Sequence, residues 1–125
     1  MGTAPKKNIL IVGASGIVGK SAVEEFIKNG EWNVYGVSRT YPSILSAEHS
    51  AVFQHTPLDL FDQRACAEVL PRFNFVTHIL YCALIEQPGD LTESWLSVKN
   101  GDDNVQMMKN CMSILLKECK SLEHV

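Results

Sequence analysis

Three glycines at regular spacing lie where an apolar stretch gives way to a helical pattern, and this arrangement suits the binding of a diphosphate. Gly13 can make a tight turn, Gly16 lets backbone N–H groups approach a ligand, and Gly19 lets the following helix pack against the preceding strand. The free N–H groups in the first turn of that helix carry partial positive charge, which complements a pyrophosphate. The residues expected to contact a dinucleotide here are Gly13, Ala14, Ser15, Gly16, Ile17, Val18 and Gly19.

The sequence on either side of the glycines distinguishes a binding loop from a tight turn that binds nothing. Residues 8–12 form a short apolar and β-branched stretch, which is typical of a strand buried on both faces of a parallel sheet. Residues 15–28 then place apolar side chains at helical spacing, and Asn29 with Gly30 supplies the stop. Because strand, glycine turn and helix follow in this order, we favour dinucleotide binding.

The loop after the second expected strand carries a cation where a dinucleotide-binding fold often has a carboxylate. A carboxylate there would bind the adenosine ribose 2′-hydroxyl, whereas this chain has Ser38, Arg39 and Thr40. Arg39 suits a 2′-phosphate because its guanidinium is a fixed cation with paired donors. The sequence therefore predicts NADP(H) as the cofactor, and the alternative is a solvated loop arginine.

The ends of the next two strands add further candidates. Asp59 and Leu60 follow the third strand, where an aspartate can accept from the adenine amino group while its apolar neighbour lies along the ring. Asp59 has a turn or a helix N-cap as its alternative, and Asp62 is the expected N-cap of the next helix. Tyr81 and Ala83 close the fourth strand, where small residues let backbone approach the cofactor ribose; Tyr81 has a core position as its alternative.

The alternation of strands and helices predicts the fold. It means parallel pairing with right-handed crossovers. We expect one α/β domain over residues 1–125, a Rossmann-type doubly wound parallel sheet that stops near the start of a fifth strand at Leu122. The later strands are expected at 33–37, 51–55 and 76–82, and the later helices at 44–49 (weak) and 62–70.

A long amphipathic helix follows the fourth strand. After a polar stretch at 85–97, apolar residues recur at helical spacing, and their methionines are most simply core residues. The face expected to be buried carries Val105, Met108, Cys111, Met112, Leu115 and Leu116.

Composition argues against several other classes of function. The formal net charge of −3 is spread without a basic block, so neither nucleic acid nor an anionic membrane is an expected partner. No apolar run approaches the roughly 20 residues of a membrane helix, and we expect a cytoplasmic protein. No histidine has metal-ligand spacing, so no metal is expected. The cysteines lie far apart and are expected to be reduced thiols: Cys66, Cys82, Cys111 and Cys119.

Taken together, these motifs resemble the progesterone 5β-reductase and iridoid synthase group, which are atypical short-chain dehydrogenases/reductases that use NADPH. The resemblance runs nearly end to end. It rests on GASGIVG at 13–19, VYGVSR at 34–39, LDL at 58–60, VTHILY at 76–81 and Asn104, which is expected to open the last helix.

The resemblance implies roles for several residues. Ser15, Gly16 and Ile17 match the loop residues that contact the cofactor. Arg39 matches the first of two basic residues after the second strand, and Thr40 matches the second imperfectly. The matches on the adenine and ribose sides are Asp59, Leu60 and Ala83.

The resemblance also limits the expected chemistry. The lysine and tyrosine that it would assign to catalysis lie beyond the fifth strand, and Tyr35, Tyr41 and Tyr81 lie in the wrong elements to replace them. Where the family continues Tyr-Val-Thr-Trp, residues 81–84 read YCAL, so the plant substrates are not expected to carry over. We therefore expect no catalytic residue in this chain.

Two functions of different classes remain. The first is the NADP(H)-binding portion of a reductase acting on an enone or carbonyl substrate, which would bind cofactor without turnover. The second is a non-catalytic NADP(H)-binding sensor or regulatory module, and a third alternative is a non-functional truncated product. A sheet of four strands leaves apolar faces uncovered, so we also expect marginal stability or a homo-oligomer.

Overall fold

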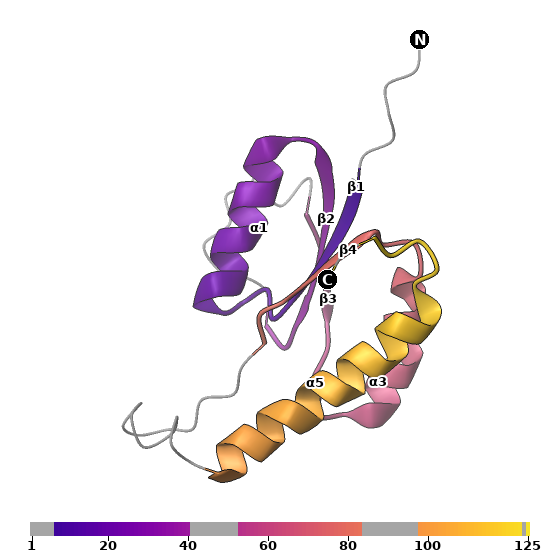
Figure 1. Ribbon diagram of the computed structural model, residues 1–125. Coiled ribbons are helices and arrows are strands. Elements are labelled where there is room, and N and C mark those ends of the chain that lie inside the picture. The colour runs from indigo at the N-terminus through magenta and orange to yellow at the C-terminus, as the bar shows by residue number, and fades with distance from the viewer. Residues whose placement is uncertain (1–6, 41–52, 84–97, 124) are drawn as a thin grey trace.

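A four-stranded parallel sheet lies between two layers of helices (Figure 1). The computed structural model describes residues 7–40, 53–83, 98–123 and 125, with 98–103 described by their backbone only. The elements, in chain order, are β1 (Lys7–Val12), α1 (Ile17–Asn29), β2 (Trp32–Ser38), β3 (Phe53–Pro57), α3 (Gln63–Val69), the 3-10 turn η1 (Leu70–Phe73), β4 (His78–Tyr81) and α5 (Val98–Glu118).

The strand order is β3-β2-β1-β4, and every pair of neighbours is parallel. The expected fold class is therefore confirmed. β1 lies at the centre, and Leu10, Ile11 and Val12 have no exposed surface because both faces of that strand are covered. The chain passes from β3 at one edge to β4 on the far side of β1, which makes the carboxyl ends of β1 and β4 a topological switch point.

The two faces of the sheet have separate apolar cores. α1 covers one face, where Val23 packs with Ile9, Ile11 and Phe53. α3, η1 and α5 cover the other face (Figure 1), where the core is built from the alternate side chains of the strands and from buried residues of the helices. Burying each large aliphatic side chain in these cores contributes about 1.5–3 kcal/mol, so the helices on both faces hold the strands in place.

Local signals define the ends of the short helices. Gly30 ends α1 in the left-handed conformation, with φ 79°, and its N–H donates to the Ile27 carbonyl. Asp62 begins α3, since its carboxylate accepts from the Ala65 N–H at 3.0 Å. The prediction that Asp62 is an N-cap is confirmed.

The face of α5 that packs into the core agrees with the expected one in part, because Cys111 and Leu115 are buried and Met112 packs against the core. Val105, Met108 and Leu116 are 47%, 44% and 58% exposed. The buried residues recur every four positions, and they are Met107, Cys111, Leu115 and Cys119. Apolar residues cover more than one stripe of this helix, so spacing alone identified the buried face only in part.

Several element boundaries also differ. α5 begins at Val98, so Asn104 lies in its second turn and does not open the helix. β4 begins at His78 rather than at residue 76, and the Thr77 N–H before it donates to the Asn8 carbonyl. After α5 the chain returns beside this segment, where the Glu123 N–H donates to the Thr77 carbonyl at 2.6 Å. The weak helix expected at 44–49 lies outside the described residues.

Within the part of the chain that the structure describes, no helix combines the length and the apolar character needed to span a membrane.

Candidate functional site

The first glycine of the loop brings the end of β1 against the end of β4. Gly13 has a φ of 87°, a conformation that strains any residue with a Cβ. Its N–H donates to the Val37 carbonyl at 2.9 Å, which ties the turn to β2. A Cβ at Gly13 would lie 2.6 Å from the Ala83 nitrogen. The tight turn expected at Gly13 is therefore present, and Ala83 lies directly beside it.

The other two glycines of the loop differ in what confines them. A Cβ at Gly19 would collide with the Gly13 carbonyl and lie 3.0 Å from the Ala14 Cα, so close packing of α1 requires a glycine there. A Cβ at Gly16 would meet nothing closer than the Gly13 oxygen at 3.6 Å. The protein's own packing thus explains Gly13 and Gly19 but leaves open space in front of Gly16.

That open space faces the amino end of α1. Gly16 is the N-cap, no side chain caps the helix, and its first turn contains no acidic residue. The N–H groups of the first turn therefore keep their partial positive charge. Ile17 and Val18 flank this end and are 85% and 66% exposed, which is unusual for large aliphatic side chains.

Ala14 and Ser15 occupy different environments within the loop. Ala14 is wholly buried in the core under α1, so only its backbone can reach a ligand. Ser15 is half-buried. Gly16, Ile17 and Val18 thus form the amino end of α1, where backbone N–H groups carry partial positive charge and two apolar side chains are exposed.

The loop after β2 begins with a buried serine. Ser38 is 8% exposed, and its hydroxyl donates to the Thr40 carbonyl at 2.6 Å. The Ser38 carbonyl accepts from the Leu58 N–H at 3.0 Å, which fixes this loop against the end of β3. Arg39 and Thr40 are exposed at the same edge of the sheet as the glycine turn. The structure therefore places the three cofactor-site residues predicted here, among them Arg39 for a 2′-phosphate, at the carboxyl end of β2.

Asp59 and Leu60 form a turn after β3. Asp59 is exposed, and its carboxylate accepts from the Phe61 N–H at 3.0 Å, so the alternative of a turn residue is confirmed. Leu60 is only 6% exposed and packs into the core, which leaves its backbone as its means of contact with a ligand. Phe61, not singled out from the sequence, is 42% exposed beside them.

Asn110 holds this turn in place from α5. Its Nδ2 donates to the Leu60 carbonyl at 2.9 Å, and its Oδ1 accepts from Gln106 Nε2 at 2.8 Å. The Cys66 thiol lies 3.6 Å from the same Leu60 oxygen. Sequence reasoning missed Asn110, because 50 residues separate it from Leu60 and no local pattern joins them.

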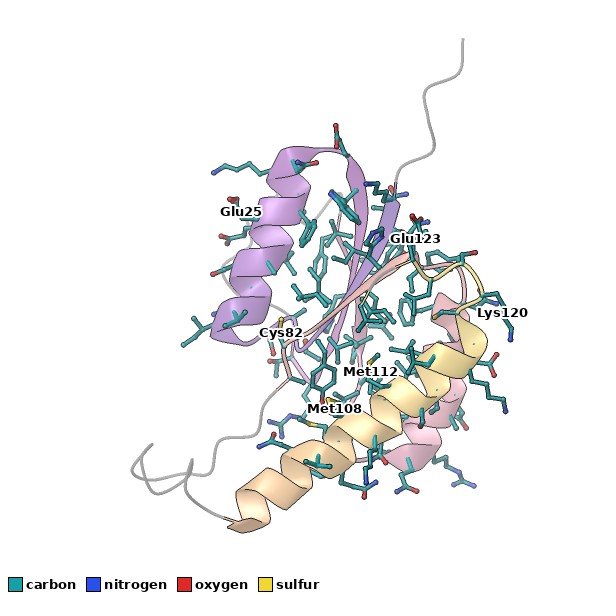
Figure 2. The ribbon with its side chains drawn as sticks, in the orientation of Figure 1. Glu25, Cys82, Met108, Met112, Lys120 and Glu123 are labelled. Carbon is teal, nitrogen blue, oxygen red and sulfur yellow. The ribbon has the colours of Figure 1, made fainter. Side chains whose placement is uncertain are left out.

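The end of β4 completes the candidate site. Tyr81 is half-buried, its hydroxyl oxygen has no hydrogen-bond partner among the described residues, and burial raises the pKa of its phenol. Its ring packs against the core, which agrees with the core alternative. The Cys82 N–H donates to the Val12 carbonyl at 2.8 Å, and Figure 2 shows Cys82 beside the turn into α1. Burial also raises the pKa of the Cys82 thiol.

Most of the expected site residues therefore converge at one edge of the sheet. The glycine turn, the loop from Ser38 to Thr40 and the segment from Tyr81 to Ala83 lie at the carboxyl ends of β1, β2 and β4. Asn104 is half-buried on α5. An edge of this kind at a topological switch point is where open α/β sheets bind their ligands.

Comparison with known proteins agrees with this geometry. The model of the NAD dependent epimerase/dehydratase family matches residues 9–120. The chain belongs to this family. Membership supports a nicotinamide dinucleotide as the class of cofactor, because the glycine turn, most of β1 and all of β2, β3 and β4 lie within the match.

Among curated proteins, this chain is similar to two enzymes of Nepeta cataria. Two (S)-8-oxocitronellyl enol synthases of Nepeta cataria are 28% and 30% identical over 120 residues, which cover 93% of this chain. The match covers 28% and 29% of those enzymes, so the chain spans less than a third of their length. The resemblance to the iridoid synthase group is confirmed.

Solved structures show the same fold. A short chain dehydrogenase family protein of Francisella tularensis superposes with a TM-score of 0.67 at 20% identity, covering 90% of this chain and 45% of that one. ElxO with NADP bound gives a TM-score of 0.64 at 24% identity, covering 90% of this chain and 50% of that one. These neighbours confirm the Rossmann-type α/β fold.

Proposed function

We propose that this chain is the NADP(H)-binding portion of a short-chain-dehydrogenase-like reductase that acts on an enone or carbonyl substrate. The observation that carries the proposal is the uncapped amino end of α1 with open space in front of Gly16. Packing requires Gly13 and Gly19, whereas Gly16 is a favourable N-cap that also leaves room for a ligand close to the backbone. Close backbone approach of this kind suits a diphosphate.

The cofactor fits the residues present. The first-turn N–H groups of α1 would bind the pyrophosphate, with Ile17 and Val18 covering its edges. Arg39 would pair with the 2′-phosphate, and the turn at Asp59 would border the adenine. When bound, the nicotinamide supplies the hydride, and the contribution of this chain is to hold and orient the cofactor.

The proposed substrate class follows from the relatives. The curated enzymes similar to this chain are enol synthases, and over two thirds of their length lies outside the match. We assign no catalytic residue to this chain. Of the described tyrosines, Tyr35 packs against Phe73 and Phe75, and Tyr81 is turned into the core, so neither phenol is placed to meet a substrate.

The same observation favours a second candidate, a non-catalytic NADP(H)-binding sensor or regulatory module. Both candidates bind cofactor through α1 without turnover by this chain itself, and they differ in whether the full-length protein reduces a substrate. The test gives this chain NADPH and a simple enone such as 2-cyclohexenone. NADPH consumption is measured as the loss of nicotinamide absorbance. Binding without consumption by this chain supports cofactor binding alone, and consumption overturns the assignment of no catalytic residue.

The binding experiment compares two substitutions in one helix. Gly16→Val places a branched side chain where the pyrophosphate would lie, and Ser21→Val places the same side chain on the exposed side of the second turn. NADPH affinity is measured by calorimetric titration. We expect Gly16→Val to weaken NADPH at least about tenfold while Ser21→Val binds like the parent chain. Unchanged affinity in a folded Gly16→Val protein would overturn the proposed function.

We also propose that the chain forms a homo-oligomer and works in the cytoplasm. Val105, Met108 and Leu116 expose an apolar stripe on α5, and such stripes favour association. Cys66, Cys82, Cys111 and Cys119 are all free thiols, which fits a reducing compartment.

A further inference from the structure

A relay of two hydrogen bonds connects β3 to the loop after β2. His55 Nε2 lies 2.8 Å from Ser38 Oγ, and Ser38 Oγ lies 2.6 Å from the Thr40 carbonyl oxygen. His55 faces Gly36 in the strand register, so it lies on the same face of the sheet as Ser38, two residues farther along β2. His55 is half-buried and Ser38 is buried.

The chemistry of the three groups fixes the direction of the relay. A carbonyl oxygen only accepts, so the single hydroxyl proton of Ser38 points to Thr40. Ser38 Oγ must then accept from the imidazole, which places a proton on His55 Nε2. Burial, the larger influence, lowers the pKa of His55, while a backbone hydrogen bond to Ser38 raises it. A neutral ring with its proton on Nε2 satisfies these constraints.

Backbone carbonyls on both sides of Arg39 are hydrogen-bonded, and the relay anchors the one after it. The Thr40 carbonyl is held by the Ser38 hydroxyl, and the Ser38 carbonyl is held by the Leu58 N–H. An exposed loop without such anchors would lose conformational freedom when it bound a ligand, and that loss would weaken binding. Anchoring the residues before and after Arg39 lowers this cost and fixes where its guanidinium can reach.

We propose that His55 is a positioning residue for recognition of the cofactor's 2′-phosphate, acting through Ser38 on the loop that carries Arg39. This inference rests on the proposed NADP(H) binding. Arg39 is the only cation of the 38–40 loop, and a guanidinium pairs with a phosphate well only when its planar donors are oriented. His55 therefore contributes to the preference for NADPH over NADH rather than to dinucleotide binding in general.

The test compares affinities for NADPH and NADH. His55→Phe keeps a planar ring but removes the donor, and Ser38→Ala removes the middle of the relay. We expect each substitution to weaken the affinity for NADPH about fivefold to tenfold and to leave the affinity for NADH nearly unchanged. His55→Gln, whose amide offers an N–H at similar reach, should restore most of the preference. Should His55→Phe fail to fold, Ser38→Ala removes a single oxygen atom and answers the same question.

A double-mutant cycle separates positioning from general stabilisation. If His55 acts through Arg39, then adding His55→Phe to Arg39→Ala should cause no further change in the ratio of the affinities for NADPH and NADH. The matched control is His78→Phe. His78 is also half-buried in a strand and hydrogen-bonded to a hydroxyl, that of Thr77, but it packs edge-to-face against Trp32 at the opposite end of the sheet. This control should keep the ratio of the parent chain.

The outcomes distinguish this inference from the proposed function. A parent chain that binds neither dinucleotide overturns both. A parent chain that prefers NADPH, combined with a His55→Phe variant that weakens both dinucleotides equally or neither, overturns the role of His55 and leaves cofactor binding intact. Loss of the preference in His55→Phe and Ser38→Ala, with rescue by His55→Gln, supports it.

Discussion

Asn110 on α5 is hydrogen-bonded to the carbonyl of Leu60 at 2.9 Å, and this contact couples a helix on one side of the sheet to the turn that follows β3. The turn carries Asp59, the candidate for adenine recognition. Its geometry depends both on local bonds within residues 59–62 and on this distant amide. A residue with no expected role in binding thus helps to hold a part of the candidate site.

The first prediction concerns that contact. Asn110→Ala removes the donor to a carbonyl in a turn that is partly shielded from water, and we expect it to lower the free energy of unfolding by about 0.5–1.5 kcal/mol. Urea denaturation followed by circular dichroism measures the change. Ser113→Ala, at an exposed position of the same helix, is the control and should stay within about 0.5 kcal/mol of the parent chain. Equal effects of the two substitutions would contradict a role for the amide.

The second prediction separates the glycines of the turn by stability. Gly13→Ala forces a Cβ into a left-handed conformation and toward the Ala83 nitrogen, and we expect a loss of at least about 2 kcal/mol. Gly16→Ala meets open space and should cost less than about 1 kcal/mol. Thermal and urea unfolding measure the loss of stability in both variants. Similar losses in the two variants would mean that Gly16 also serves packing, and the main support for a bound diphosphate would be lost.

The sequence was sufficient wherever the determining contacts are local. The strand, the glycine turn and the helix up to Gly30 follow from a continuous pattern, and the Asp62 cap acts over three residues. The buried face of α5 depends instead on how the helix is rotated against the sheet. Two overlapping apolar stripes on that helix share Cys111 and Leu115, and contacts with η1 and α3 decide which other residues are buried.

The supports of the site could not be predicted for a related reason. His55 meets Ser38 only because β2 and β3 pair in a particular register, with His55 opposite Gly36. A shift of one residue in that register would turn the imidazole to the other face of the sheet. The sequence therefore indicated Arg39 as a phosphate ligand, whereas the residues proposed to position it became apparent only in three dimensions.

The third prediction is a pH dependence of stability. Burial lowers the pKa of His55 in the folded chain below the value of 6.5 expected when unfolded. Between these two pKa values the unfolded chain binds more protons, so the free energy of unfolding falls as the pH drops below about 6.5. Urea denaturation at about pH 7.5 and about pH 5.5 measures the slope. His55→Gln should flatten it, and a variant with the same slope as the parent chain would contradict the assignment to His55.

The fourth prediction concerns association through α5. Val105, Met108 and Leu116 expose an apolar stripe, of which Leu116 at 58% is the most exposed. Because a charged side chain in an apolar contact loses hydration without gaining a partner, Leu116→Lys should shift the chain toward monomer. Sedimentation velocity over a range of concentrations measures the shift.

Ser113→Lys serves as the control for association, because it adds the same charge on the same helix at an exposed polar position. It separates loss of an apolar contact from simple charge repulsion, which falls as salt screens it. We expect Ser113→Lys to keep the oligomeric state of the parent chain, and Leu116→Lys to remain dissociated at high salt. A parent chain that sediments as a monomer at every concentration would show that the stripe does not join two copies of this chain.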